Sequence, residues 1–356
     1  MAPEAGEAVK TVLTPDSNGR VYCGEGSLTL KFEQEFTKLA GLPDRPLGVN
    51  SCTAAIDLTL HMLGVGPGDE VIVTPMTCSA SNGPVVNRGA NLVWADVDPL
   101  TGLIRPDSVA NVMTASTKAI IAVDWAGRTC NYDALYKVVG TAQIIEDAAH
   151  KLYLDDQFGD YVCWSFGPIK HLTTGGYGGA IMVPDEEYDR ARLLRWHGLD
   201  RLSSADFRCS QDIQEVGYRY HMTDDQASIG LANLALAQKS VAMAKANAFR
   251  YTQEFKYVNG LRVPDFDGNC DYWLFGILIE NNRDDFMRKM AEHGVPTSRA
   301  HARNDHHAGY ARATVAQDGE LPGTTYFDDH QVNIPVGWWL SDKDIDTVIH
   351  AVKDCL

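Results

Sequence analysis

Three short segments of the sequence carry side chains that can do chemistry together. In the first, 165–179, Lys170 follows Ser165 by five residues, and two threonines and four glycines come after it. This pattern places an amine, either a cation or a nucleophile, beside backbone N–H groups that a glycine-rich chain lets approach an anion closely. The spacing is not that of a P-loop, so a Gly-rich turn with a solvated lysine is the alternative interpretation.

The second and third segments supply a carboxylate and the start of a helix. Residues 144–150, IIEDAAH, form an apolar run that ends in two acids, and Asp147 is the second of them. Ligands bind at the carboxyl ends of strands in open α/β sheets, so Asp147 can accept a hydrogen bond from a protonated heterocycle, or simply cap the next helix. Residues 50–55, NSCTAA, open a helix whose N–H groups can bind a phosphate, although any N-cap looks similar.

Together the three segments describe a site for a phosphorylated aromatic aldehyde. The helix start suits the phosphate, the carboxylate suits a ring nitrogen, and the lysine suits the carbonyl carbon. This division of labour is the one that a pyridoxal phosphate enzyme needs.

Alternating strands and helices over about residues 45–185 must position these segments. Four apolar or β-branched runs are bounded by Gly, Pro, Asp or Thr, which predicts buried strands of a mostly parallel sheet. They lie at 69–76, 91–98, 118–125 and 143–150, and helices are predicted between them over 54–65 and 106–113. The alternation predicts an α/β fold.

The rest of the chain predicts a second, smaller unit. Helices are predicted over 185–200 and about 224–256, followed by a strand at 272–279 and helices over 283–294 and 342–355. A chain of 356 residues exceeds the usual size of one core. We therefore expect a large domain with an N-terminal arm over 1–240 and a small α+β domain over 241–356.

Composition excludes several classes of function. The chain has 31 Lys+Arg and 47 Asp+Glu, a net charge of −16, so the whole molecule repels nucleic acid and anionic membranes. No stretch approaches the roughly 18 apolar residues of a membrane helix, and the N-terminus lacks a signal-peptide pattern. The 8 cysteines show no C-x-x-C motif and no zinc spacing, so we expect reduced thiols, no metal and a cytoplasmic protein.

The sequence resembles the DegT/DnrJ/EryC1/StrS family of sugar aminotransferases. The matching stretches, in order along the chain, are FEQEF at 32–36, NSCTAAIDLTLHMLGVGPGDEVIVTP at 50–75, VDWAG at 123–127, IEDAAH at 145–150, SFGPIKHLTTG at 165–175, RWHGLDR at 195–201 and GYRYHMTDDQASIGLANL at 217–234. The resemblance implies the type I aspartate-aminotransferase fold, the cofactor pyridoxal 5′-phosphate, and a homodimer whose active site lies at the subunit interface.

Carried over residue by residue, the resemblance assigns roles to these segments. It implies that Lys170 bonds to the aldehyde carbon of the cofactor and later moves a proton, and that Asp147 keeps the ring nitrogen protonated. It also implies that the phosphate accepts hydrogen bonds from the backbone amides of Thr53 and Ala54 and from the hydroxyl of Ser165.

Other positions match the family less closely. His150 falls beside the ring oxygen of the cofactor, with a satisfied buried histidine as the alternative. Arg219 stands where many members have Asn, and the resemblance implies that it reaches the phosphate from the neighbouring subunit.

Cys78 replaces the aromatic ring that stacks on the cofactor, so the sequence leaves open which residue stacks on it. Cys52 replaces the usual Gly, and TTGGYGG at 173–179 is one residue longer than the common motif and lacks its acid.

The expected reaction is a ping-pong transamination. A histidine replaces Lys170 in relatives that act as sugar dehydratases, so the lysine opposes that alternative. We expect L-glutamate as donor and a nucleotide-linked keto sugar, a 4-keto-6-deoxyhexose, as acceptor; a cyclitol or other keto-sugar aminotransferase is not excluded. The resemblance puts Arg303 and His301 at the substrate entrance, although a polar loop also explains these residues. His301, His306 and His307 have no carboxylate spaced to complete a metal site with them, so we expect no metal there.

Overall fold

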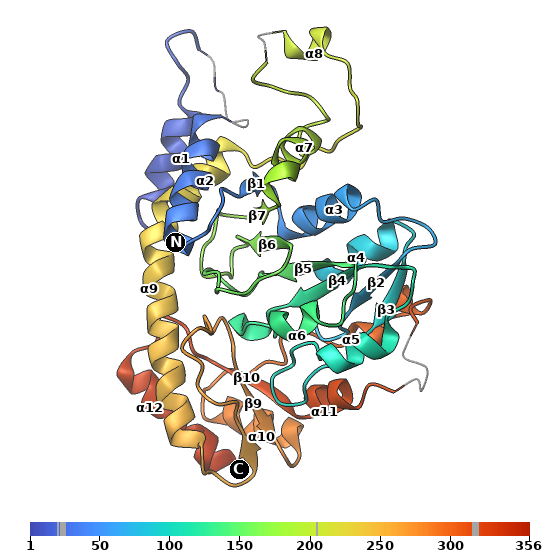
Figure 1. Cartoon of the computed structure of the whole chain (residues 1–356). Coiled ribbons are helices and arrows are strands. Elements are labelled where there is room, and N and C mark those ends of the chain that lie inside the picture. The colour runs from blue at the N-terminus through green and yellow to red at the C-terminus, as the bar shows by residue number, and fades with distance from the viewer. Residues whose placement is uncertain (20, 22–25, 204–205, 315–319) are drawn as a thin grey trace. The chain divides into compact units, whose positions relative to one another are not determined.

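The chain forms two compact units, each built from two stretches of sequence. The computed structural model describes residues 1–19, 21, 26–203, 206–314 and 320–356 (Figure 1). The first unit comprises Met1–Val65 and Ile145–Gln238, and the second comprises Gly66–Ile144 and Lys239–Leu356. The expected domain boundary at residue 240 stays a prediction.

The first unit contains a mixed sheet in the order β1-β7-β6-β5. Strand β7 is antiparallel to both of its neighbours, whereas β5 and β6 are parallel. Its elements are α1 (Ala5–Leu13), α2 (Ser27–Ala40), β1 (Leu47–Val49), α3 (Cys52–Met62), β5 (Gln143–Asp147, which begins at the boundary), β6 (Tyr161–Ser165), β7 (Gly179–Met182), η2 (Asp185–Glu187), α7 (Tyr188–Leu194), α8 (Phe207–Ser210) and the beginning of α9 (Asp224–Phe255).

The start of α3 is fixed by a cap and by close packing against β7. The Ser51 hydroxyl accepts the Ala54 amide at 3.1 Å, which is an ordinary N-cap. A Cβ placed on Gly179 would lie 2.6 Å from the Ser51 carbonyl carbon and 2.7 Å from the Cys52 nitrogen. Only glycine therefore lets β7 approach the first turn of α3 this closely.

The second unit begins with three parallel strands in the order β4-β2-β3. A hydrophobic cluster of buried side chains, including Ile72, Ile120 and Tyr132, packs between these strands and helices α5 and α6. The elements of this part are β2 (Glu70–Val73), α4 (Ser79–Asn87), β3 (Asn91–Trp94), α5 (Pro106–Val112), β4 (Thr117–Val123), η1 (Trp125–Gly127) and α6 (Tyr132–Tyr136).

The C-terminal part of the second unit has its own antiparallel sheet, in the order β10-β9-β8. One hydrophobic cluster, drawn entirely from residues 244–355, joins this sheet to the end of α9 and to α12. The elements are β8 (Leu261–Arg262), β9 (Phe275–Ile279), α10 (Arg283–Glu292), η3 (Asn304–His306), η4 (Ala308–Tyr310), α11 (Pro322–His330), β10 (Gln331–Ile334) and α12 (Asp342–Cys355).

The four strands predicted from apolar runs are confirmed as β2, β3, β4 and β5. The predicted helices correspond to α3, α5, α7, α9, α10 and α12, and the predicted C-terminal strand corresponds to β9. Seven cysteines lie within the described ranges, all of them free thiols, and Cys23 lies outside these ranges. No described helix combines the length and apolarity needed to span a bilayer.

Candidate active site

Asp147 is a buried carboxylate at the carboxyl end of a strand. It is the last residue of β5, lies opposite Cys163 of the parallel strand β6, and is 3% exposed. The Ala149 amide donates to its Oδ1 at 3.0 Å. The sequence predicted this position at the end of a strand. A buried carboxylate of this kind can accept a hydrogen bond from a protonated group of a ligand.

The first turn of α3 lies against this carboxylate. Cys52, the first residue of the helix, has its Sγ 3.7 Å from Asp147 Oδ1 and 3.5 Å from the Cys163 carbonyl oxygen. Burial, and then the charge of Asp147, raise the pKa of the Cys52 thiol well above its usual value. No local sequence pattern predicts this contact, because the two residues lie 95 positions apart.

The two amides predicted to bind phosphate differ in their surroundings. Thr53 is exposed, and its amide has no hydrogen-bond partner among the described residues. The Ala54 amide already donates to the Ser51 hydroxyl. The predicted roles of both stay predictions, and Thr53 is the exposed residue of the two, at the positive end of the α3 dipole.

Lys170 lies in the loop that joins β6 to β7. Its amide donates to the Gly167 carbonyl at 3.1 Å, and its charge is near enough to lower the pKa of the Cys52 thiol against the larger effects of burial and Asp147. Lys170 is therefore near the α3 start that faces Asp147. The neighbouring lysine in this unit, Lys151, is buried and donates to Asp155 at 3.0 Å.

Thr174 closes the loop that carries Lys170. Its amide donates to the Phe166 carbonyl at 3.1 Å, and its hydroxyl donates to the Tyr177 carbonyl at 2.7 Å. The Phe166 amide completes the closure by donating to the Gly178 carbonyl at 2.8 Å. The conformation of the lengthened TTGGYGG motif, which the sequence left open, is thus a closed loop whose base is pinned by backbone bonds.

Ser165 and Lys170 face the same glycine. A Cβ placed on Gly167 would lie 3.7 Å from Ser165 Oγ and 4.0 Å from Lys170 Cγ. Ser165 ends β6 and pairs in register with Gly179 of β7, the residue that touches the start of α3. Ser165, Lys170 and the start of α3 therefore lie near one another in the first unit, and their predicted roles stay predictions.

His150 is buried just after β5. It is 5% exposed and lies in the turn that the Lys151 amide closes by donating to the Ala148 carbonyl at 3.0 Å. Burial agrees with both readings of the sequence, a satisfied core histidine and a cofactor neighbour, so its role stays a prediction.

The segment that carries Arg219 is anchored to its own chain. The amides of Tyr218 and Tyr220 donate to the carbonyls of Leu194 and Arg195, at 2.6 and 3.0 Å, and the Asn50 amide donates to the Tyr220 carbonyl at 2.7 Å. The Arg219 side chain is exposed. This arrangement holds the backbone beside α3 and leaves the guanidinium on the surface.

A cavity of about 530 Å³ beside Arg219 gathers positive charge in this acidic protein. Two guanidinium groups, those of Arg201 and Arg208, lie over the Trp196 ring at 5.1 and 5.4 Å from its centroid. Among the described residues that line the cavity none is acidic. We call it the basic cavity, and its lining residues are Trp196, His197, Leu199, Arg201, Arg208, Arg219 and His221.

Cys78 lies in the second unit, where it is the N-cap residue of α4. An aromatic side chain from a distant part of the chain is close to it, because the Tyr310 hydroxyl donates to the Ser79 carbonyl at 3.3 Å and Cys78 contributes to raising the Tyr310 pKa after burial. Tyr310 is a residue that the sequence analysis missed, since no local pattern links it to Cys78.

Arg303 and His301 have partners of their own in the second unit. Arg303 makes a bidentate pair with Asp305 through Nε and Nη2, at 2.9 and 2.6 Å, and Nη1 donates to Thr325 at 2.9 Å. The cavity of about 550 Å³ beside it is also lined by acids, Asp305, Glu320 and Asp329. The His301 ring packs edge-on against Trp125 at 5.8 Å. Their predicted substrate contacts stay predictions.

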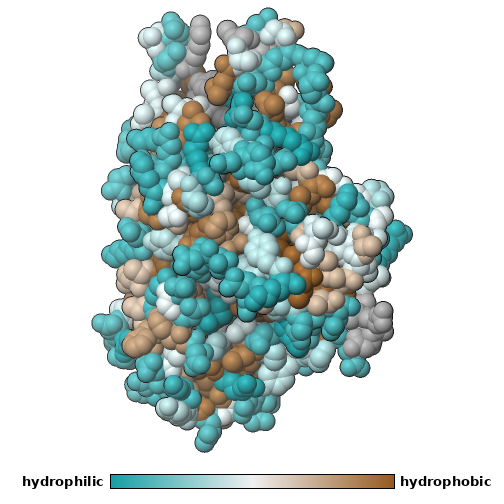
Figure 2. Space-filling view, in the orientation of Figure 1, coloured by the Kyte–Doolittle hydropathy of each residue, from teal (hydrophilic) through white to brown (hydrophobic). Residues whose placement is uncertain are grey.

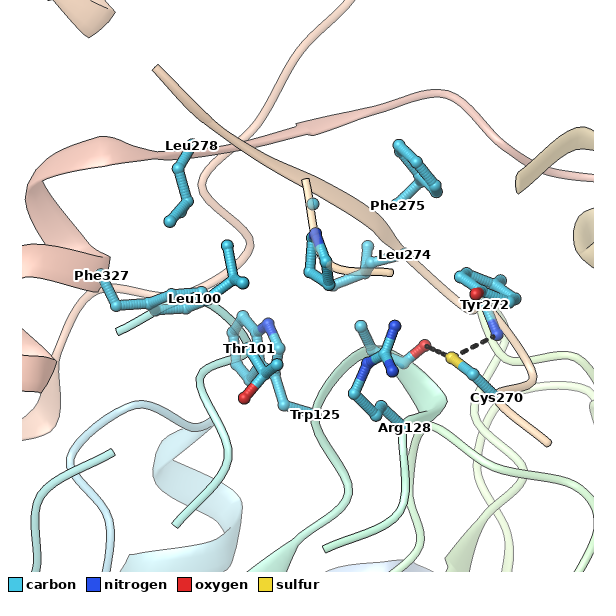
Figure 3. A pocket seen from close by; sticks show the side chains of 13 residues that line it. Leu100, Thr101, Trp125, Arg128, Cys270, Tyr272, Leu274, Phe275, Leu278 and Phe327 are labelled. Atoms are coloured by element: carbon cyan, nitrogen blue, oxygen red, sulfur yellow. Dashed lines mark hydrogen bonds between the residues drawn. The ribbon is translucent and has the colours of Figure 1, made fainter. Parts of the chain in front are cut away.

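Another cavity in the second unit is too small for a sugar substrate. It encloses about 40 Å³ beneath β9, and Figure 3 shows it lined mainly by apolar side chains such as Trp125, Leu278 and Phe327. Cys270 also lines this cavity, and its thiol sulfur is 3.9 Å from the Ala126 carbonyl oxygen. Sites for small organic ligands usually enclose about 300 Å³ or more, so this space holds at most about one or two waters.

Comparison with known proteins completes the description of the site. Residues 4–353 match the DegT/DnrJ/EryC1/StrS aminotransferase family. The spore coat polysaccharide biosynthesis protein SpsC of Bacillus subtilis strain 168 is 30% identical over 354 residues, which cover 94% of this chain and 90% of SpsC.

Solved structures of sugar aminotransferases have the same fold. That of CalS13 from Micromonospora echinospora has a TM-score of 0.90 at 31% identity and covers 99% of this chain and 97% of the other. The putative sugar aminotransferase Spr1654 from Streptococcus pneumoniae, solved in PLP and PMP forms, has a TM-score of 0.88 at 25% identity, over 100% of this chain and 96% or more of the other. The predicted α/β fold of a type I pyridoxal-phosphate transferase is confirmed.

Proposed function

Because this chain belongs to the DegT/DnrJ/EryC1/StrS aminotransferase family, we propose that it transfers the amino group of L-glutamate to a nucleotide-linked keto sugar with pyridoxal 5′-phosphate as cofactor. One observation carries the proposal: the buried Asp147, the capped start of α3 and the Lys170 loop meet in one unit. Each of these groups is of the type that one part of this cofactor requires.

The donor set fits the cofactor. The exposed Thr53 amide lies at the positive end of α3, and the Ser165 hydroxyl lies beside the loop glycine that also contacts Lys170. These groups suit a phosphate, which favours helix N-termini and charge-assisted hydrogen bonds. The carboxylate of Asp147 suits a protonated ring nitrogen, because a buried acid is stabilised in its charged form by such a donor.

When bound, the cofactor supplies an electron sink for charge that develops on the reacting carbon. Asp147 holds the proton on the ring nitrogen by accepting its hydrogen bond. Lys170 Nζ would take the proton from the carbon that bears the donor amino group and deliver it to the cofactor's aldehyde carbon on the other side of that nitrogen, so one side chain would serve as nucleophile and as general base. The donor product leaves before the keto sugar binds, which gives a ping-pong cycle.

The proposed acceptor is a nucleotide-linked 4-keto-6-deoxyhexose. The relative CalS13 is described as a sugar aminotransferase and SpsC as a polysaccharide biosynthesis protein, which supports a sugar substrate. A nucleotide diphosphate needs cations, and Arg303 is already paired with Asp305 beside an acidic cavity. The basic cavity around Trp196 is therefore the better candidate to attract an anionic substrate.

We also propose a homodimer in which Arg219 serves the partner's cofactor phosphate. Its side chain is exposed, while its backbone is held by bonds to residues 50 and 195–197. Large apolar side chains are exposed in the same unit, and Ile169, Tyr177 and Val216 are each more than 70% exposed. Exposed apolar residues of this size favour a protein interface.

Visible absorbance tests the proposal. Full-length protein incubated with pyridoxal 5′-phosphate should show an absorbance band that L-glutamate bleaches. Lys170→Ala should lose the band, whereas Lys151→Ala, which alters the neighbouring buried lysine, should keep it. If L-glutamate leaves the band unchanged while another amino acid bleaches it, the donor is wrong; if Lys170→Ala keeps the band, the site is wrong.

The second half-reaction, in which the amine form of the protein reacts with a keto compound, identifies the acceptor. Protein converted to its amine form should return to the aldehyde form when mixed with a nucleotide-linked 4-keto-6-deoxyhexose. A panel of nucleotide keto sugars and cyclitol ketones distinguishes the candidates. Recovery with a cyclitol ketone and with none of the sugars would contradict the proposed substrate class.

A further inference from the structure

A thiol lies against the carboxylate that the proposed function assigns to the ring nitrogen. Cys52 Sγ is 3.7 Å from Asp147 Oδ1, within hydrogen-bonding distance for sulfur, and the two residues are 8% and 3% exposed. The same sulfur is 3.5 Å from the Cys163 carbonyl oxygen. A thiol has one proton to donate, so these two acceptors compete for it.

The carboxylate is the stronger acceptor of the two. Hydrogen bonds to an ionised oxygen are stronger than those to a neutral carbonyl, and water does not weaken a bond at this depth of burial. Burial and the nearby negative charge of Asp147 raise the pKa of the thiol, so it keeps the proton that it donates. Cys52 is therefore a neutral donor and not a nucleophile.

Oδ1 of Asp147 is held from two directions. The Ala149 amide reaches it at 3.0 Å from the chain that follows β5, and the Cys52 thiol reaches it from the first turn of α3. Two donors on one oxygen fix the plane of a carboxylate and disperse part of its negative charge.

We propose that Cys52 is a positioning residue for Asp147, whose thiol donates to Oδ1 and so sets the orientation and the effective charge that the carboxylate offers to the ring nitrogen of the cofactor. The part of this inference that concerns the cofactor rests on the proposed function. The thiol–carboxylate bond itself belongs to the protein without cofactor, so the bond and the function can be tested separately.

Infrared spectroscopy of the full-length protein tests the bond. The S–H stretching band of Cys52 is identified as the one lost in Cys52→Ser. It should lie at lower frequency in the unsubstituted protein than in Asp147→Asn, because the neutral amide is a weaker acceptor. An unchanged band in Asp147→Asn would mean that the thiol donates to the Cys163 carbonyl alone, which overturns the proposal. This comparison decides the matter even if Cys52→Ala does not fold.

Binding of pyridoxamine 5′-phosphate tests the consequence for the cofactor. This form binds without a bond to Lys170, so its Kd reports the non-covalent contacts. Cys52→Ala should raise the Kd about three- to tenfold, the range expected for one lost hydrogen bond, and Cys52→Ser, which keeps a donor, should restore most of the affinity. Cys130→Ala is the matched control, because it removes a buried thiol that donates to the Val123 carbonyl at 3.3 Å.

The outcomes separate the two proposals. If Cys52→Ser weakens binding as much as Cys52→Ala, or if Cys130→Ala weakens it equally, the thiol acts by packing and the positioning role is wrong. If the unsubstituted protein does not bind pyridoxamine 5′-phosphate, the proposed function fails and the role toward the cofactor fails with it. An infrared shift in Asp147→Asn would still demonstrate the bond in that case.

Discussion

His221 shows how the surroundings of a single residue set its charge. Its ring stacks on Trp196 at a centroid distance of 5.4 Å and is 8% exposed. Burial, and then the positive charges of Arg201 and Arg195, lower its pKa to about 4. The histidine is therefore neutral at physiological pH, although it lines the basic cavity.

This shift predicts a pH-dependent contribution to stability. Between pH 6.5 and about 4, the unfolded chain binds a proton on His221 that the folded chain excludes. The contribution is therefore complete above pH 6.5 and lost as the pH falls to about 4, up to roughly 3 kcal/mol. His221→Gln should flatten the unfolding free energy over that range in chemical denaturation, whereas His350→Gln, at an exposed position of α12, should not.

The contacts of Cys52 and Arg303 mark the limit of sequence reasoning at this scale. Residue types and family resemblance pointed to Asp147 and Lys170 as site residues. Whether a side chain already has a partner depends on folding: Arg303 is paired with Asp305, and Cys52 meets a carboxylate from another strand. The Cys52 contact joins residues 95 positions apart, so no local pattern encodes it, whereas the Arg303–Asp305 pair is local and only its geometry depends on the fold.

Among the secondary-structure elements, a buried ion pair ties α2 to β1 and to the end of α7. Glu33 Oε1 accepts a hydrogen bond from Arg195 Nη1 at 2.7 Å and another from the Gly48 amide at 2.8 Å. Arg195 Nη1 also donates to the Gly48 carbonyl at 2.8 Å. Both side chains of the pair are almost fully buried, so the charge of Arg195 is balanced by Glu33, which Arg45 Nε also approaches at 3.8 Å.

Breaking this pair should destabilise the first unit. Glu33→Gln keeps the shape of the side chain but leaves the Arg195 charge buried, so we expect a loss of about 3 kcal/mol in the free energy of unfolding. Glu35→Gln, on the same helix, removes the partner of an exposed ion pair with Lys38 and should cost about 0.5 kcal/mol or less. Equal losses in urea denaturation would contradict the structural role given to the buried pair.

The contact of β7 with α3 predicts a second element-scale effect. Gly179→Ala places a methyl group against backbone atoms of Ser51, Cys52 and Trp164, none of which can rotate away. We expect a loss of about 1–3 kcal/mol of stability, together with weaker binding of cofactor at the displaced helix start. Thermal unfolding and a Kd measurement check both effects. Gly176→Ala is the control, because nothing lies within 4 Å of its added Cβ, and it should change neither.

Sequence patterns predicted strands β2 to β5 and β9, but missed β1, β6 and β7 and the helix α2 (Ser27–Ala40). The runs that became β2 to β5 were evident because short apolar or β-branched stretches stood between turn signals. Strand β1 has only 3 residues, and its pairing with β7 spans more than 130 positions, so its three-residue LGV sequence carries no detectable signal. For β1, therefore, short length and a distant partner strand hid the element from the sequence patterns.

For the whole molecule, the net charge of −16 coexists with local positive sites. Hydrophilic residues cover much of the face seen in Figure 2, with apolar patches between them. The basic cavity and the exposed Arg219 concentrate cationic groups in the first unit. The acidic surplus repels extended polyanions, whereas a small phosphorylated ligand responds mainly to charges within about 10 Å of it.

A mixture of two inactive variants tests the proposed dimer. Lys170→Ala lacks the nucleophile and Arg219→Ala lacks the proposed phosphate contact from the partner. In a mixed dimer one of the two sites has both groups intact, so activity should return when the variants are unfolded and refolded together. No recovery, with mixed dimers demonstrated by differently tagged chains, would place Arg219 in the site of its own subunit.

The closure at Thr174 separates the part of the loop that carries Lys170 from the part where its length varies. Residues 175–177 form a turn beyond the Thr174 amide bond, and Gly176 and Tyr177 are exposed. Additional residues inserted there would lengthen the turn without moving the base of the loop. The segment 175–177 can therefore change in length without displacing the lysine, whereas a bulky label attached there would lie beside Tyr177, in the surface proposed for the dimer.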